Sequence, residues 1–139
     1  KSYATEIYKN HSLQFAPINS NISPYDKSTG LKNTAYYYTI FPNVLLNIAP
    51  GRLQTNVVKP TSPNSCVVDF DYYFDEVSDK VIKNDIKFSN EVQLEDIKIC
   101  EEVQKRLESR GYNQGRISPQ SEKGLYHFQS VLKEKLKNG

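Results

Sequence analysis

The side chain whose position points most directly to chemistry is Asp96, in a helix that the sequence predicts over residues 91–110. At about 100° of rotation per residue, Val92, Ile99 and Val103 share one apolar face of this helix. Asp96 falls in the middle of that face. Burial without a partner disfavours the charged form of a carboxylate, so such a group takes up a proton. We therefore expect a cation or several hydrogen-bond donors beside Asp96.

Three interpretations of Asp96 remain open from this pattern. They are a salt bridge to a Lys or Arg, a helix that faces a water-filled cavity, and a metal ligand. The position alone favours the first two. Other charges of the helix form pairs four residues apart, such as Glu101 with Lys105 and Glu102 with Arg106, which is typical of a solvated face.

The remaining nucleophilic and metal-binding residue types do not form a local motif. His11 and His127 are the only histidines, so no HExxH or similar histidine pair is present. Cys66 and Cys100 do not form a CxxC pair, and both fall on apolar faces of predicted elements. We expect both cysteines to be small core residues with reduced thiols, which favours a cytoplasmic location.

Amide and phenol side chains on the predicted strands are candidates for ligand contacts. Asn47 lies in a strand expected over residues 44–48, and Gln54 and Asn56 lie in the next strand. Such a pattern fits either a solvated sheet face or an apolar cavity with a few polar groups. We take Tyr38, Asn47 and Asn56 as candidate substrate-binding residues.

Length and composition limit the class of protein. The chain has 139 residues, of which 37% are hydrophobic and 24% charged, so it fits one domain or a piece of a larger one. A net charge of +2 argues against a nucleic-acid partner, and no apolar run is long enough to span a membrane. Since the first residue is Lys1 and the chain holds no Met, we expect further polypeptide upstream.

Strands are predicted in the first two thirds of the chain and helices in the last third. The strands are expected at residues 5–8, 12–16, 34–40, 44–48, 52–59 and 65–74, with a long loop at 17–32 and a turn at 60–64. The first helix is expected to be capped by Ser89, and the second to cover residues 121–136. This segregation predicts an α+β domain with an antiparallel sheet against a long helix.

Several segments resemble the C-terminal catalytic domain of Rieske-type ring-hydroxylating oxygenase α subunits, in the branch of choline and carnitine monooxygenases. They are IFPNVLLNI at 40–48, LQTN at 53–56, VQLEDIKICEEVQ at 92–104, SRGYNQGRISP at 109–119 and GLYHF at 124–128. The resemblance implies a helix-grip (START/Bet v 1-like) fold. Residues 1–139 would then form a single domain, the C-terminal part of the catalytic domain.

The resemblance also implies a mononuclear Fe(II) held by two histidines and one carboxylate, with Asp96 as the carboxylate ligand. The histidine pair and the motifs for a [2Fe–2S] Rieske centre are absent from this chain and would lie upstream. The implied partners are a small organic substrate, O₂, an electron-transfer reductase and further copies of the subunit in a trimer. The fragment alone is expected to be inactive.

Two other classes of function stay open at this point. One is a non-catalytic, START-like binding module that holds a quaternary ammonium ligand among the tyrosine rings of its strands, namely Tyr36, Tyr37, Tyr38, Tyr72 and Tyr73. The other is a structural subunit that helps to assemble an oxygenase.

Overall fold

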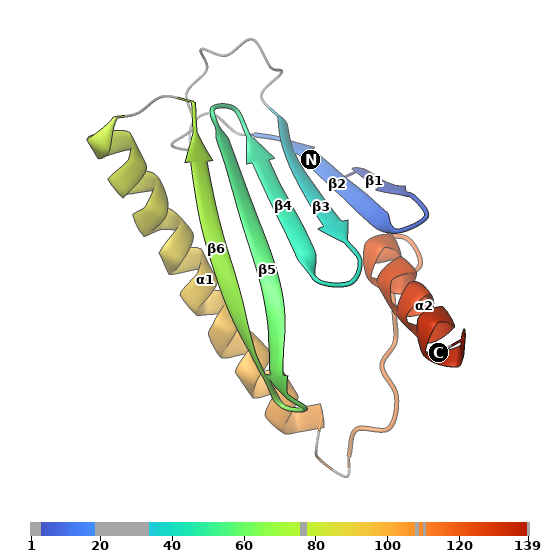
Figure 1. Cartoon of the computed structure of the whole chain (residues 1–139). Helices are drawn as coiled ribbons and strands as arrows, with labels where there is room; N and C mark the ends of the chain where they lie inside the picture. Colours follow the sequence, from blue (N-terminus) through green and yellow to red (C-terminus); the bar gives the residue numbers. More distant parts are fainter. Residues whose placement is uncertain (1–3, 19–33, 76–77, 108, 110, 139) are drawn as a thin grey trace. The chain divides into compact units, whose positions relative to one another are not determined.

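The computed structural model describes residues 4–18, 34–75, 78–107, 109 and 111–138 (Figure 1). Most of the loop expected at residues 17–32 lies outside these ranges. The chain divides into two compact units. Unit one comprises residues 1–75 and 117–139, and unit two comprises residues 76–116.

Unit one is built on a six-stranded antiparallel sheet in which each strand pairs with the next along the chain. This order confirms the predicted antiparallel sheet. The strands are β1 (Ala4–Ile7), β2 (His11–Pro17), β3 (Thr34–Ile40), β4 (Val44–Ala49), β5 (Arg52–Ser62) and β6 (Ser65–Phe74).

The turn between β4 and β5 lies between the strands predicted at residues 44–48 and 52–59. Gly51 has a φ of 75°, a left-handed conformation that residues with a side chain rarely adopt. The backbone oxygen of Gly51 accepts a hydrogen bond of 3.1 Å from the backbone nitrogen of Asp75, just after β6. This contact holds the turn against the end of the neighbouring strand.

Strand β5 extends further than predicted, because Pro60 does not end it. Pro60 lies opposite Cys66 in the ladder, and the pairing with β6 continues to Ser62 with an irregularity between Pro60 and Ser62. The ladder with β4 stops at Val57. Beyond that point β5 has a neighbour on one side only, where a residue without a backbone N–H is tolerated.

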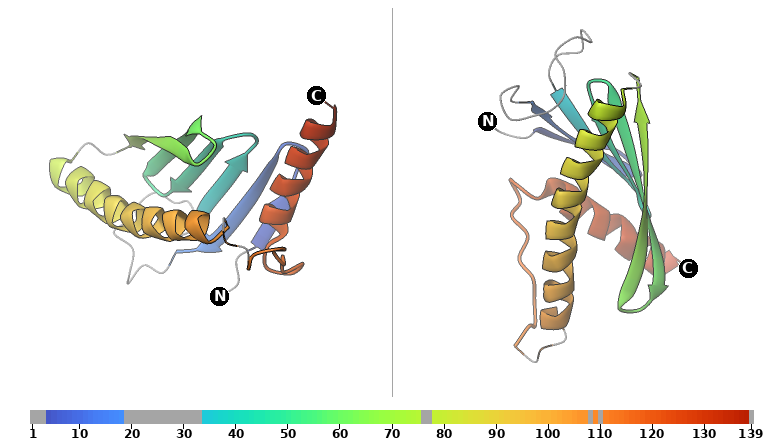
Figure 2. Two further views of the ribbon diagram at one scale, coloured as in Figure 1. Left: turned by 90° about the horizontal axis from the view of Figure 1, so that it is seen from below. Right: turned by 90° about the vertical axis from the view of Figure 1, so that its left-hand side faces the viewer.

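Helix α2 (Lys123–Asn138) packs on β1 and β2 in the same unit (Figure 2). It begins two residues later than predicted, since Ser118 and Glu122 close a turn before it: the backbone nitrogen of Ser118 donates to Oε2 of Glu122 at 2.6 Å. Val131 is 8% exposed, and the rings of Phe128 and Phe41 lie 5.6 Å apart. These apolar contacts hold α2 on the sheet.

Unit two consists of helix α1 (Asp79–Leu107) and the residues that flank it. The helix begins ten residues earlier than the predicted cap at Ser89, with a hydrogen bond of 2.9 Å from the backbone nitrogen of Ile82 to the backbone oxygen of Ser78. Ser89 is therefore an interior residue. A 29-residue helix is about 43 Å long at about 1.5 Å per residue.

Few apolar side chains are buried. Among the described residues, the buried hydrophobic ones are Leu13, Ala35 and Val131. The expectation that both cysteines lie in the core is wrong, since Cys66 and Cys100 are exposed. No helix within the described ranges is long and apolar enough to cross a membrane. The sheet followed by two helices confirms the α+β class.

Candidate functional site

Asp96 lies in α1, and its surroundings differ from the sequence prediction. The apolar stripe that carries it is exposed, with 39% of Val92, 53% of Ile99 and 48% of Val103 accessible to solvent. Asp96 is exposed as well. The physical reason is that unit two holds this one helix, which has no second layer within its own unit to cover the stripe.

Within the described parts of the chain, no group of three or more His, Cys, Asp or Glu side chains is placed to hold a metal ion. Asp96 supplies one carboxylate, which is a suitable ligand type for Fe(II). The two histidines of the chain lie in unit one, His11 on β2 and His127 on α2. The residues present therefore fit one ligand of a metal centre rather than a complete one.

The register of the sheet sorts the other candidate residues onto two faces, because residues directly opposite in an antiparallel pair share a face. One face, here called the cavity face, carries a row of paired residues that runs across the six strands. In strand order the row is Thr5, Gln14, Tyr37, Asn47, Gln54 and Tyr72. A second row on the same face contains Ser12, Thr39, Leu45, Asn56 and Phe70.

The structure brings Asn47 and Asn56 to the cavity face and places Tyr38 on the opposite one. Tyr38 pairs with Leu13 and Leu46, and its ring lies 6.1 Å from that of His11. Tyr37 takes the place on the cavity face that we expected for Tyr38. Because side chains alternate along a strand, Tyr37 and Tyr38 must lie on opposite faces. The sequence alone does not say which of the two faces the cavity.

The five strand tyrosines do not converge on one point either. Tyr37 and Tyr72 lie on the cavity face, whereas the other three pair with residues of the opposite face. A cation held by all five tyrosine rings would have to contact both faces of the sheet at once, which one ligand cannot do. The five tyrosines therefore do not form the shared cation site on which the binding-module alternative depended.

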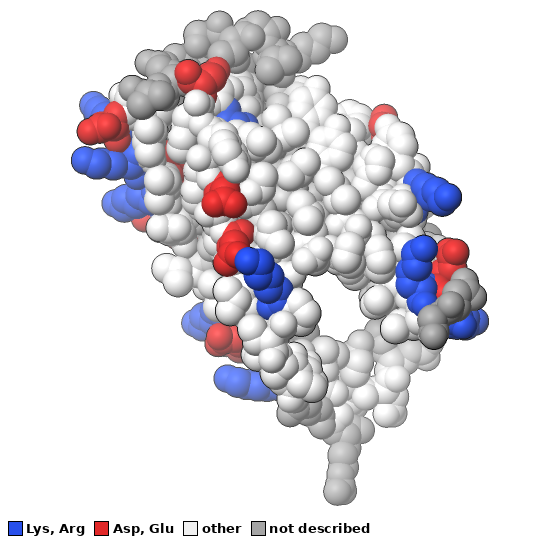
Figure 3. All heavy atoms as spheres, viewed as in Figure 1, with Lys and Arg blue, Asp and Glu red and all other residues white. Residues whose placement is uncertain are grey.

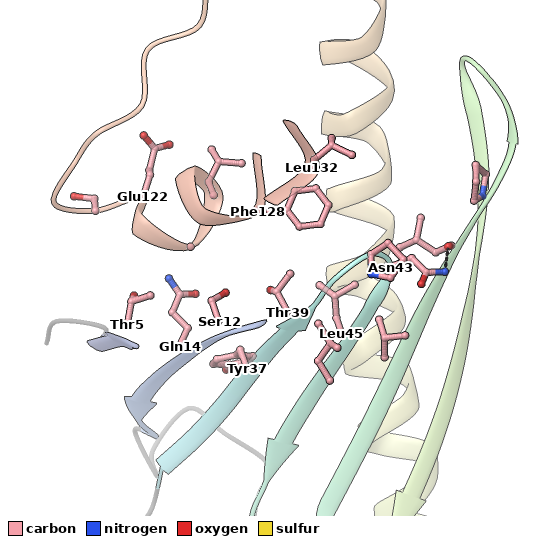
Figure 4. Close-up of a pocket in the computed structure, with 18 residues that line it drawn as sticks. Thr5, Ser12, Gln14, Tyr37, Thr39, Asn43, Leu45, Glu122, Phe128 and Leu132 are labelled. Atoms are coloured by element: carbon pink, nitrogen blue, oxygen red, sulfur yellow. Dashed lines mark hydrogen bonds between the residues drawn. The ribbon is translucent and has the colours of Figure 1, made fainter. Parts of the chain in front are cut away.

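A cavity of about 1020 Å³ lies between α2 and the cavity face, entirely within unit one (Figure 4). Phe128 and Leu132 of α2 point toward the sheet, and Glu122 lies above Thr5 and Gln14. Most of the lining is apolar, with a few hydroxyl and amide groups, which is the usual character of a small-molecule site. The polar lining residues from the strands include Thr5, Ser12, Gln14, Tyr37 and Thr39.

A chain of hydrogen bonds runs along β5 on the cavity face. Nη2 of Arg52 donates to Oε1 of Gln54, and Nε2 of Gln54 donates to Oδ1 of Asn56 at 2.8 Å. Gln54 is 2% exposed and Asn56 is 8% exposed. The guanidinium carbon of Arg52 lies 5.3 Å from the centre of the Tyr72 ring, a cation–π contact. The sequence named the two amides but not the arginine that orients them.

The charged residues of the sheet lie mainly on β5 and β6. In the view of Figure 3, acidic and basic side chains lie over these two strands, while the surface over β2, β3 and β4 is mostly uncharged. Nζ of Lys59 pairs with Oδ2 of Asp69 on the face opposite the cavity. The hydrogen bond from Lys59 to Asp69, together with the attraction between their charges, raises the pKa of Lys59 above its ordinary value.

Comparison with known proteins identifies relatives along nearly the whole chain. A family model described as ring hydroxylating alpha subunit (catalytic domain) matches residues 17–138. Choline monooxygenase of Arabidopsis thaliana is 34% identical over 99% of this chain. The carnitine monooxygenase oxygenase subunit of Escherichia coli K12 is 28% identical over 98% of it.

Solved structures of CntA, a quaternary ammonium Rieske monooxygenase, share the fold. A complex with an inhibitor gives a TM-score of 0.81 over 95% of this chain at 24% identity. A complex with L-carnitine gives a TM-score of 0.76 over 96% at 23% identity. This likeness confirms the predicted helix-grip class of α+β fold. The chain spans about a third of the length of these relatives, 33% of the Arabidopsis protein and 38% of the inhibitor-bound CntA chain.

Proposed function

Because this chain belongs to the ring-hydroxylating oxygenase α-subunit family, within its catalytic domain, we propose that it is part of a Rieske non-haem iron oxygenase. The enzyme would use O₂ and electrons from a reductase to hydroxylate an aromatic or quaternary ammonium substrate. The family match over residues 17–138 carries this proposal. The names of the similar proteins, choline and carnitine monooxygenases, favour the quaternary ammonium class.

In this proposal Asp96 is the carboxylate ligand of the mononuclear iron. Asp96 is exposed on its helix, so its carboxylate is accessible to a metal ion. The two histidine ligands would come from other polypeptide, because this chain has no histidine pair at metal-binding spacing. When bound, the iron would supply the activation of O₂. Asp96 would hold the ion in place and balance part of its charge.

The other requirements of the reaction lie outside this chain. We propose a [2Fe–2S] Rieske centre in the parent protein, a reductase that supplies electrons to it, and a homotrimer as the assembly. A cytoplasmic location is part of the same proposal. The similar plant choline monooxygenases, by contrast, are named as chloroplastic proteins.

Substrate binding is proposed on the cavity face of the sheet, at Asn47 and Asn56. Both amides lie in rows that also contain lining residues of the cavity, Tyr37 opposite Asn47 and Leu45 opposite Asn56. Tyr38, the third candidate, would act from the opposite face and so only through the sheet. We therefore propose the two asparagines, with Tyr37, as the substrate contacts of this region.

The test is to replace Asp96 by Ala in the full-length protein. Loss of a metal-binding carboxylate should remove the mononuclear iron and abolish substrate-dependent O₂ consumption, while the absorbance of the Rieske centre stays. Glu95→Ala is the matched control, because Glu95 is the neighbouring exposed acid of the same helix. Iron content and O₂ consumption in Asp96→Ala equal to those of the control would overturn the proposal.

A further inference from the structure

We propose that Arg52 and Gln54 fix the amide of Asn56 as a hydrogen-bond donor toward the bound substrate. The site would then select compounds that carry an acceptor oxygen, such as a carboxylate, remote from the reacting group. This inference rests on the proposed function, because it concerns the substrate of the same site. Arg52 and Gln54 are positioning residues in it, and Asn56 is the residue that touches the substrate.

The first step is the orientation of Gln54. A guanidinium has five N–H donors and no acceptor, so only the amide oxygen of Gln54 can face it. Nη2 of Arg52 donates to this oxygen. The oxygen and nitrogen of an amide are hard to tell apart by position alone. The guanidinium of Arg52 decides between the two orientations of Gln54, because it can only donate.

The second step passes this orientation along the strand. Since its oxygen faces Arg52, Gln54 turns its NH₂ group to Asn56, and Nε2 lies 2.8 Å from Oδ1 of Asn56. The amide oxygen of Asn56 therefore faces Gln54, and its NH₂ group is the end of the row. Within the described residues, Nδ2 of Asn56 donates no hydrogen bond to another side chain.

The third step places this donor beside the cavity. Asn56 pairs with Leu45, and two residues further along β5 on the same face lies Val58. Both Leu45 and Val58 line the cavity. Asn56 itself is 8% exposed, so its donors lie where water is scarce and an acceptor from a ligand is worth more than at an open surface.

The charge at the start of the row favours an anionic or strongly accepting partner at its end. Arg52 is a permanent cation, and hydrogen bonds polarise one another along a chain. The Asn56 N–H groups are accordingly better donors than those of an isolated amide. A quaternary ammonium compound with a carboxylate has the matching chemistry, because its ammonium end cannot accept a hydrogen bond.

The variant Gln54→Glu tests the orientation directly. A carboxylate at position 54 accepts from Arg52 and presents a second acceptor to Asn56. The Asn56 amide then turns over to donate to Glu at position 54 and offers its oxygen to the substrate. We expect the Kd of γ-butyrobetaine to rise about tenfold or more, since an attractive contact becomes a repulsive one. The Kd of butyltrimethylammonium, which lacks the carboxylate, should change by less than about threefold.

The measurement is calorimetric binding of both probes to the full-length protein. A second variant, Asn56→Leu, removes the donor without adding charge and should weaken γ-butyrobetaine selectively as well. Gln129→Glu repeats the amide-to-carboxylate change at an exposed position on α2 and should alter neither Kd.

Three results would overturn the inference: a wild-type protein that does not prefer γ-butyrobetaine, equal weakening of both probes, or no change in either variant. The proposed function fails on different observations, namely absence of mononuclear iron or of substrate-dependent O₂ consumption. Selective loss of γ-butyrobetaine binding in a protein without oxygenase activity would support the inference and reject the function.

Discussion

A Cβ atom at Gly124, in the first turn of α2, would lie 3.3 Å from Oγ of Ser12 on β2. The next nearest atoms are also from the strands, Cβ of Ser12 at 3.9 Å and Cγ2 of Thr5 at 4.0 Å. The helix therefore approaches the sheet closely at the one position that lacks a side chain. Thr5, Ser12 and Gly124 all line the cavity, so this contact sets one end of it.

Replacing Gly124 by Val should push α2 away from the sheet. Valine has a better helix propensity than glycine, but its Cβ would already be in a tight contact with Oγ of Ser12, and its two methyl groups add further bulk beside Ser12 and Thr5. We expect the free energy of unfolding to fall by about 1–3 kcal/mol, the usual cost of overpacking. Denaturant unfolding measures it. Gln129→Val, at an exposed position of the same helix, is the control, and an equal loss in both variants would contradict the close approach.

The ring pair Phe41–Phe128 is the second link between α2 and the sheet. The ring centres lie 5.6 Å apart at an interplanar angle of 51°, a favourable tilted geometry. A double-mutant cycle with Phe41→Leu and Phe128→Leu should give a coupling energy of about 0.5–1.5 kcal/mol in unfolding experiments.

A second cycle supplies the reference for this pair. Tyr36 contacts Phe15 at a centroid distance of 6.2 Å on the sheet face opposite the cavity. Combining Phe128→Leu with Tyr36→Leu pairs two residues on different faces, so their effects should add within about 0.3–0.5 kcal/mol. A coupling in the first cycle no larger than this would mean that the two rings do not interact.

The strands could be predicted from the sequence with few errors, and each error has a local cause. Pro60 indicated a turn, but β5 continues through it. The missing backbone N–H of Pro60 is tolerated there, because β4 ends before that point and β5 has a neighbour on one side only. Ser89 indicated a helix start, but the helix begins after Ser78, a second serine and so the same helix-capping residue type. Propensity identifies possible ends of elements, and the pairing of neighbouring segments decides which of them is used.

The candidate site was less predictable, because it depends on faces and orientations. Asn47 and Asn56 were identified as amides on strands, yet only the register shows that they share a face with the cavity lining. The direction of the hydrogen bonds from Arg52 to Asn56 requires side-chain positions. Asp96 was recognised by its position in an apolar stripe, and its role as a ligand stays a proposal.

The ion pair between Lys59 and Asp69 predicts a specific pH dependence. The hydrogen bond to Asp69 is the largest cause of the raised pKa of Lys59, followed by the attraction between the two charges. A group whose pKa is higher in the folded state stabilises the fold fully below its unfolded value, here 10.5. This contribution is lost as the pH rises through the folded pKa, so the raised pKa of Lys59 stabilises the fold below pH 10.5 and stops doing so at strongly alkaline pH.

Two variants separate the causes of this shift, with the pKa of Lys59 followed by NMR titration of its side chain. Asp69→Asn removes both the charge and the strongest acceptor, so the pKa of Lys59 should fall toward its ordinary value. Asp71→Asn removes a more distant charge on the same sheet face, which raises the pKa of Lys59 least among the causes. Its effect should be smaller, and added salt should reduce it further because both side chains are exposed to solvent. A larger fall in Asp71→Asn than in Asp69→Asn would mean that Lys59 pairs with Asp71 rather than with Asp69.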